Sequence, residues 1–189
     1  MGAGMNLTRR AVSAAIVLTG AAAWSDPGAA ATAAEIDQKV DLALQNLYAH
    51  DAVAKTLAEQ AKGILVFPDI VKGGLLIGGQ FGDGALMQGG EPVGYYRSVA
   101  VSYGLQAGAE TFGYALFFMN DATLAYLDRS GGWEIGVGPT LTVLDEGAAA
   151  SFSTTTAKDD IYAFFFAQKG LMAGLGIQGS KITRIEPGR

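Results

Sequence analysis

Apolar residues recur at helical spacing near the start of the chain and at alternate positions over most of the remainder. From Glu35 to Ala61 they fall on one side of a helix, which predicts an amphipathic helical segment with a break near His50. The stripe consists of Ile36, Val40, Ala43, Leu44, Leu47 and Tyr48, continued by Val53, Leu57 and Ala61. The apolar run at 64–67 predicts a short buried strand that ends at Pro68.

The remainder of the chain has the alternation that is typical of β-strands. We expect strands at about residues 73–80, 84–88, 94–109, 111–119, 132–144, 148–155, 160–168, 170–178 and 181–186. One short helix interrupts them, because Asn120 is a good N-cap and Gly131-Gly132 a good helix end. The strands that carry Phe117 and Phe165 are apolar on both faces, so both faces are buried or contact something apolar.

These elements predict an α+β fold. In it, an N-terminal helical segment packs on a large, curved, Gly-rich antiparallel β-sheet or barrel with one short inserted helix.

A five-residue pattern, in which two glycines flank three residues, occurs four times in the predicted strands. Its glycines are Gly74 and Gly78, Gly104 and Gly108, Gly132 and Gly136, and Gly170 and Gly174. Because side chains alternate along a strand, the two glycines of each pair would lie on the same face. Glycine within a strand indicates a bend, a bulge or the close approach of another group, so we expect these eight glycines to be structural.

The first 34 residues have the layout of a secretory signal peptide. A short basic start ends at Arg10, and the apolar run at 11–23 is too short to cross a bilayer. Small-residue cleavage sites follow at 29–31 and 32–34. We therefore expect residues 1–34 to be a signal peptide and 35–189 a single domain, which is exported to the periplasm and associates peripherally with a membrane. The arginines at 9–10 also permit the twin-arginine route, although adjacent arginines are common in signals of the general secretory route, which we favour.

Composition excludes several classes of function. The chain has no cysteine, which rules out disulfides, thiol catalysis, Cys-ligated metals and a lipidated N-terminal cysteine. Of 18 acidic and 13 basic residues, the leader to residue 34 contains Asp26, Arg9 and Arg10, so removing it leaves 17 and 11, a net charge of −6. An acidic domain is a poor candidate for nucleic-acid binding, which depends on neutralising phosphates.

No catalytic or metal-binding constellation is evident. The pattern GxGxxG at 174–179 is followed by a predicted strand instead of the helix that a dinucleotide site requires. His50 is the only histidine and has no second histidine with which to bind a metal. The acidic pairs at 145–146 and 159–160 fit solvated loop charge better than a calcium site, and no GxSxG motif is present. We therefore expect no enzymatic activity, no cofactor and no metal.

Basic residues border the apolar, glycine-rich strands. Lys62, Lys72 and Lys169 stand at the ends of predicted elements. They are either ordinary surface charges with snorkelling stems or a rim that meets anionic headgroups while the strands around Phe117 and Phe165 meet acyl chains.

Three segments resemble the SYLF domain family. Residues 61–68 followed by 72–74 resemble the start of that domain, residues 102–108 its central motif, and 160–162 with 169–171 and 179–180 its closing segment. The resemblance runs from about Glu35 to Glu186 and implies a lipid-binding module without known enzymatic chemistry. Eukaryotic relatives bind phosphoinositides and act with the actin cytoskeleton. This chain resembles the bacterial branch instead, because it has an export signal and an acidic charge, so we expect no actin partner.

The sequence thus predicts non-catalytic binding of anionic phospholipid at a bacterial envelope membrane, with Lys62, Lys72, Lys169, Phe117 and Phe165 as lipid-contacting candidates. The alternative is an envelope protein–protein interaction module that uses an exposed strand edge or aromatic face.

Overall fold

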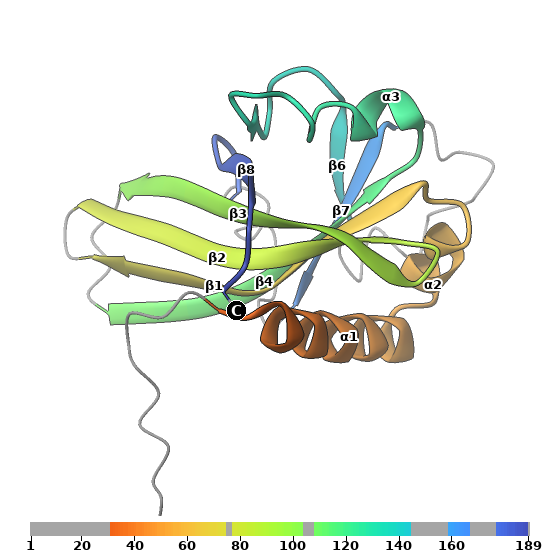
Figure 1. The fold of residues 1–189 in the computed structure, drawn as a ribbon, viewed down its shortest axis with the longest axis horizontal. Helices are drawn as coiled ribbons and strands as arrows, with labels where there is room; N and C mark the ends of the chain where they lie inside the picture. The colour runs from red at the N-terminus through yellow and green to blue at the C-terminus, as the bar shows by residue number, and fades with distance from the viewer. Residues whose placement is uncertain (1–30, 75–76, 104–107, 145–158, 167–176, 189) are drawn as a thin grey trace, which may run out of the picture.

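The computed structural model describes residues 31–74, 77–103, 108–144, 159–166 and 177–188. Its helices are α1 (Ala33–His50), α2 (Ala52–Ala58) and α3 (Asp121–Leu124). Its strands are β1 (Gly63–Gly74), β2 (Ile77–Gln88), β3 (Glu91–Tyr103), β4 (Gly108–Phe118), β5 (Trp133–Glu134), β6 (Leu141–Leu144), β7 (Ile161–Phe166) and β8 (Lys181–Ile185). These strands form one curved sheet in the order β5-β8-β3-β2-β1-β4-β7-β6, with α1 along one face (Figure 1).

The predicted α+β architecture is confirmed, with one difference in strand direction. The described strand pairs are antiparallel except for β6 and β7, which run parallel. The predicted helical segment and its break are confirmed, since Asp51 ends α1 and caps α2 through a hydrogen bond from the Ala54 amide. The helix begins at Ala33, two residues earlier than predicted, because Thr32 and Glu35 form a capping box.

The prediction that Pro68 ends the first strand is wrong. β1 continues to Gly74 because a bulge around Pro68 and Asp69 inserts one extra residue relative to β2 and β4. Proline is tolerated at a bulge, where its missing N–H removes no ladder hydrogen bond. The predicted strands 73–80 and 84–88 are in fact the end of β1 and one continuous β2, whereas 148–155 and most of 170–178 lie outside the described residues.

Two of the glycine pairs differ from the prediction. Gly74 and Gly78 face each other across β1 and β2 instead of sharing one strand. Gly132 and Gly136 flank the short β5 with φ of 77° and 100°, so they allow turns that interrupt the predicted strand 132–144. Gly108 begins β4 opposite Gly74, and Gly104, Gly170 and Gly174 lie outside the described residues.

Both faces of the sheet carry a buried core, as the aromatic alternation predicted. One core includes Phe67, Tyr114 and Trp133 and lies on the face away from α1. The other lies between the sheet and α1, where Val40 and Leu44 pack with Phe117. The sheet is therefore a central layer, and α1 determines how much of one face is covered.

Candidate functional site

Helix α1 covers only part of its sheet face. Its buried side chains, Ile36, Val40, Leu44 and Leu47, belong to the same core as Val66, Ala85 and Phe117. Figure 1 shows that β1, β2 and β3 extend past the first turn of α1. The ends of these strands therefore carry the same side-chain face beyond the part of the sheet that α1 covers.

An exposed row of apolar side chains follows on this uncovered surface. Val71, Phe81 and Val99 are register partners across β1, β2 and β3, and Val101 is two residues further along β3. Side chains of register partners lie on the same face. Their exposed fractions are 39%, 58%, 45% and 63%, and they are four of the seven large apolar side chains that are exposed in the described part of the chain. We refer to these four residues as the apolar ladder.

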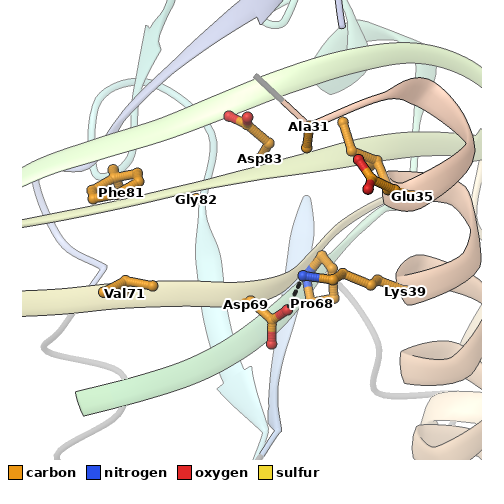
Figure 2. Close-up of a pocket in the computed structure, with 10 residues that line it drawn as sticks. Ala31, Glu35, Lys39, Pro68, Asp69, Val71, Phe81, Gly82 and Asp83 are labelled. Carbon is orange, nitrogen blue, oxygen red and sulfur yellow. Dashed lines mark hydrogen bonds and ion pairs between the residues drawn. The ribbon is translucent and has the colours of Figure 1, made fainter. Parts of the chain in front are cut away.

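Two ladder residues, Val71 and Phe81, line a groove beside the start of α1. The groove has a volume of about 360 Å³. It is lined by Ala31, Glu35, Ile36, Lys39, Pro68, Asp69, Val71, Phe81, Gly82 and Asp83. Figure 2 shows Val71 and Phe81 on neighbouring strands, with Lys39 and Asp69 facing each other at the mouth. Pro68 and Asp69 of the β1 bulge lie at this mouth, where Asp69 meets Lys39 of α1.

Ion pairs flank the groove. Lys39 Nζ lies 2.8 Å from Asp69 Oδ2, and both side chains are about half exposed. Arg97 donates from Nε and one terminal nitrogen to the two oxygens of Asp83, at 2.6 and 2.7 Å. The hydrogen bond to Asp83 raises the pKa of Arg97 above its ordinary value. Asp83 and Arg97 are register partners in the row next to Phe81 and Val99, on the ladder face.

A carboxylate in the first turn of α1 completes the groove. Glu35 accepts hydrogen bonds from the Thr32 amide at 2.9 Å and from its hydroxyl at 3.0 Å. The backbone hydrogen bond from Thr32, and then the one from its side chain, lower the pKa of Glu35. Glu35 is therefore held as a fixed negative charge beside the groove.

The structure does not bring the predicted basic residues together. Lys62 precedes β1 and Lys72 is near the other end of that strand, so roughly 30 Å of extended chain separates them. Lys72 is the register partner of Gln80, and its side chain is on the sheet face opposite the ladder. Lys169 lies outside the described residues. Lys62 instead lines a second hollow of about 490 Å³ between the helices and the β2–β3 turn.

The predicted aromatic contacts are positioned differently from each other. Phe117 is fully buried under α1, with its ring 4.9 Å from that of Phe164. Phe165 is half-buried against the core on the opposite face, with its ring 6.0 Å from that of Tyr114. Neither side chain lies in the apolar ladder.

Sequence reasoning missed the ladder residues Val71, Phe81, Val99 and Val101. No local signal distinguishes them, because a strand that is buried on one face also carries apolar residues at alternate positions.

Other polar groups serve structural roles. His50 is exposed and its Nδ1 lies 2.8 Å from the Asn46 carbonyl oxygen. Tyr114 donates to Ser98 at 2.8 Å inside the core, and burial raises the pKa of its hydroxyl. Asp159 and Asp160 accept hydrogen bonds from threonine side chains of the preceding segment.

Among the residues that the structure describes, no group of three His, Asp or Glu side chains could hold a metal, and no helix is long and apolar enough to span a bilayer.

Comparison with known families confirms the resemblance to the SYLF family. Residues 99–186 match the family model Ysc84, described as "Las17-binding protein actin regulator". The matched stretch runs from Val99 in β3 to the end of β8, and it contains the second and third of the three motifs. The SYLF family is associated with lipid or actin-regulator binding and is a binding family rather than a catalytic one. No curated protein matches the chain.

Proposed function

We propose that this protein binds phospholipid without catalysis and docks on a membrane surface through the apolar ladder. The observation that carries the proposal is the clustering of Val71, Phe81, Val99 and Val101 on one uncovered part of the sheet. Contiguous exposed apolar patches are typical of protein or membrane contact sites. The family match supports a binding function, and the sheet supplies the rigid surface that such a contact needs.

The size of the ladder sets the strength of the contact. Fully burying a Val or Phe side chain contributes about 1.5–3 kcal/mol, and these four are about half exposed, so each can contribute roughly 1 kcal/mol on docking. The total of about 4 kcal/mol corresponds to a Kd near 1 mM. The ladder alone therefore supports weak, reversible, peripheral binding, and each of its side chains matters.

We place this contact at an envelope membrane, with the protein exported to the periplasm. The basic, apolar and small-residue order of the first 34 residues supports this placement. N-terminal sequencing of protein from the periplasmic fraction tests it. A chain that starts at Met1 in the cytoplasm would contradict it.

Vesicle flotation with ladder variants tests the function. Replacing both Phe81 and Val101 by Ser removes the two most exposed side chains, so about 2 kcal/mol is lost and partitioning onto phospholipid vesicles should fall roughly 30-fold. The matched control is Val137→Ser, which removes a side chain of 52% exposure outside the ladder and should float like the parent protein. Equal flotation of all three proteins would overturn the proposal. Lipid-independent capture of one envelope protein, lost in the double variant, would instead support a protein-binding module.

A further inference from the structure

The cations that border the apolar ladder occur beside carboxylates. Among the described residues, three cations lie around the ladder on its own face, namely Lys39, Arg97 and Lys181. Lys39 is paired with Asp69 and Arg97 with Asp83, at 2.8 and 2.6 Å. Lys181 is the register partner of Val99 on one side and of Glu134 on the other. The rim of the ladder therefore carries both signs of charge.

The pairs are close enough to the ladder to meet a headgroup when the ladder is buried. Asp83 and Arg97 occupy the next row on the same face as Phe81 and Val99. Asp69 and Lys39 line the same groove as Val71 and Phe81 (Figure 2). Three of the four side chains remain accessible, since Arg97 is 41% exposed and Lys39 and Asp69 are 59% and 48% exposed, whereas Asp83 is only 15% exposed.

The two ion-paired cations, Lys39 and Arg97, give little attraction for an anionic surface. A lysine near such a surface contributes about 1 kcal/mol when its charge acts alone. The field of a cation that is hydrogen-bonded to a carboxylate is largely cancelled beyond a few ångströms. Glu35 adds a negative charge to the groove, and the whole chain carries −5. The local and overall charge thus disfavour anionic headgroups as the main ligand.

We propose that the ligand class of this surface is zwitterionic phospholipid. Such a headgroup carries a phosphate and an ammonium a few ångströms apart. The phosphate can approach Arg97 or Lys39, and the ammonium can approach Asp69 or Glu35, while the acyl region meets the ladder. This inference rests on the proposed membrane contact and specifies its headgroup.

Flotation with two vesicle compositions tests the inference with the mature protein. Vesicles of phosphatidylethanolamine and phosphatidylcholine are compared with vesicles that also contain phosphatidylglycerol, at low and high NaCl. We expect about equal partitioning onto both, and less than about a twofold change with salt, because paired charges give little long-range field to screen.

A charge variant makes the test specific to the rim. Asp69→Asn removes the hydrogen-bonded partner of Lys39 and leaves only the electrostatic contact with Glu35, so it should create a preference for the anionic vesicles that high salt removes. Its matched control is Asp128→Asn. Asp128 Oδ1 lies 3.8 Å from a terminal nitrogen of Arg184, whose side chain is on the other face of the sheet. Removing this charge should therefore leave partitioning unchanged. The Lys39–Asp69 pair is a surface pair, so its loss costs at most about 1 kcal/mol of stability.

The outcomes separate the two proposals. Binding of the parent protein only to anionic vesicles, abolished by salt, would overturn the zwitterionic ligand and leave the membrane function standing. No binding to either vesicle would overturn both. Identical behaviour of Asp69→Asn and Asp128→Asn would show that the Lys39–Asp69 pair does not set the headgroup preference.

Discussion

Two glycines of β2 lie directly against the bulge of β1, and one of them provides a sharp test of the fold. A Cβ added to Gly84 would collide with the carbonyl oxygen of Val66 and lie 2.8 Å from Cδ1 of Phe67. A Cβ on Gly82 would likewise collide with the Asp69 carbonyl oxygen. Because these obstacles include backbone atoms, a new side chain can be accommodated only if the bulge moves. We therefore expect Gly84→Ala to be strongly destabilising.

The expected magnitude follows from overpacking. Extra carbon atoms in a close-packed region cost about 1–3 kcal/mol, so we expect Gly84→Ala to lower the free energy of unfolding by about 2 kcal/mol. For a domain of this size, that change lowers Tm by about 4–8 °C. The matched control is Gly73→Ala on β1, where a Cβ would meet nothing within 4 Å and φ is not positive. Gly73→Ala should be neutral or stabilise by up to about 1 kcal/mol, because alanine reduces the entropy of the unfolded chain.

Thermal unfolding followed by circular dichroism, together with urea titration, measures both variants. If Gly84→Ala melts at the same temperature as Gly73→Ala, the close approach of β1 to Gly84 is wrong, and with it the bulge that shapes the groove. The expectation that Gly104 and Gly174 are structural remains a prediction, since both lie outside the described residues.

Two further predictions concern hydrogen bonds at the ends of elements. In a chain that retains Thr32, Thr32→Ala removes the capping box of α1, so the free energy of unfolding should fall by about 1 kcal/mol, and an unchanged urea midpoint would contradict the cap. Hydrogen bonds from the Thr140 backbone, the Asn120 side chain and the Thr140 side chain lower the pKa of Asp160 below its ordinary value of 3.8. A lowered pKa in the folded state stabilises the protein above the unfolded pKa, and that stability is lost as the pH falls through the folded value. The parent protein should therefore lose more stability below about pH 4 than Asp160→Asn does, and parallel acid unfolding curves would refute this.

The helical part of the fold was predictable because its determinants are local. The apolar stripe that contains Ile36, Val40, Leu44 and Leu47 identified the buried face of α1 correctly. The start of the helix was misplaced, although Thr32 and Glu35 show the spacing of a capping box. Thr32 had been assigned to the leader and Glu35 to the domain, and this division hid a signal that the sequence contains.

The errors in the strands have nonlocal causes. Pro68 is a strand breaker by its own chemistry, and only the partners β2 and β4 show that the chain continues through it with a bulge. The parallel pairing of β6 with β7 likewise depends on contacts between distant segments. Local sequence preference contains neither piece of information.

The candidate site could not be predicted for a related reason. Val71, Phe81, Val99 and Val101 look like ordinary core residues in the sequence, because strands buried on one face contain such residues at alternate positions. Their exposure depends on the point at which α1 stops covering the sheet, which is a property of the assembled fold. Conversely, Phe117 looked like a surface aromatic contact because the strand is apolar on both faces, and α1 buries it.

The site at which the leader is cleaved affects both the start of α1 and the lining of the groove. The Gly188 amide donates to the Ala31 carbonyl oxygen at 3.0 Å, and Thr32 forms a parallel bridge with Gly188. A leader that ended at residue 34 would therefore take away the cap of α1 and its contact with the C-terminal segment. A leader that ended at Ala31, the last residue of the first small-residue site, would leave Thr32 and the capping box in place. Ala31 lines the groove, and either cut would remove it, so the groove of the mature protein would lack this residue.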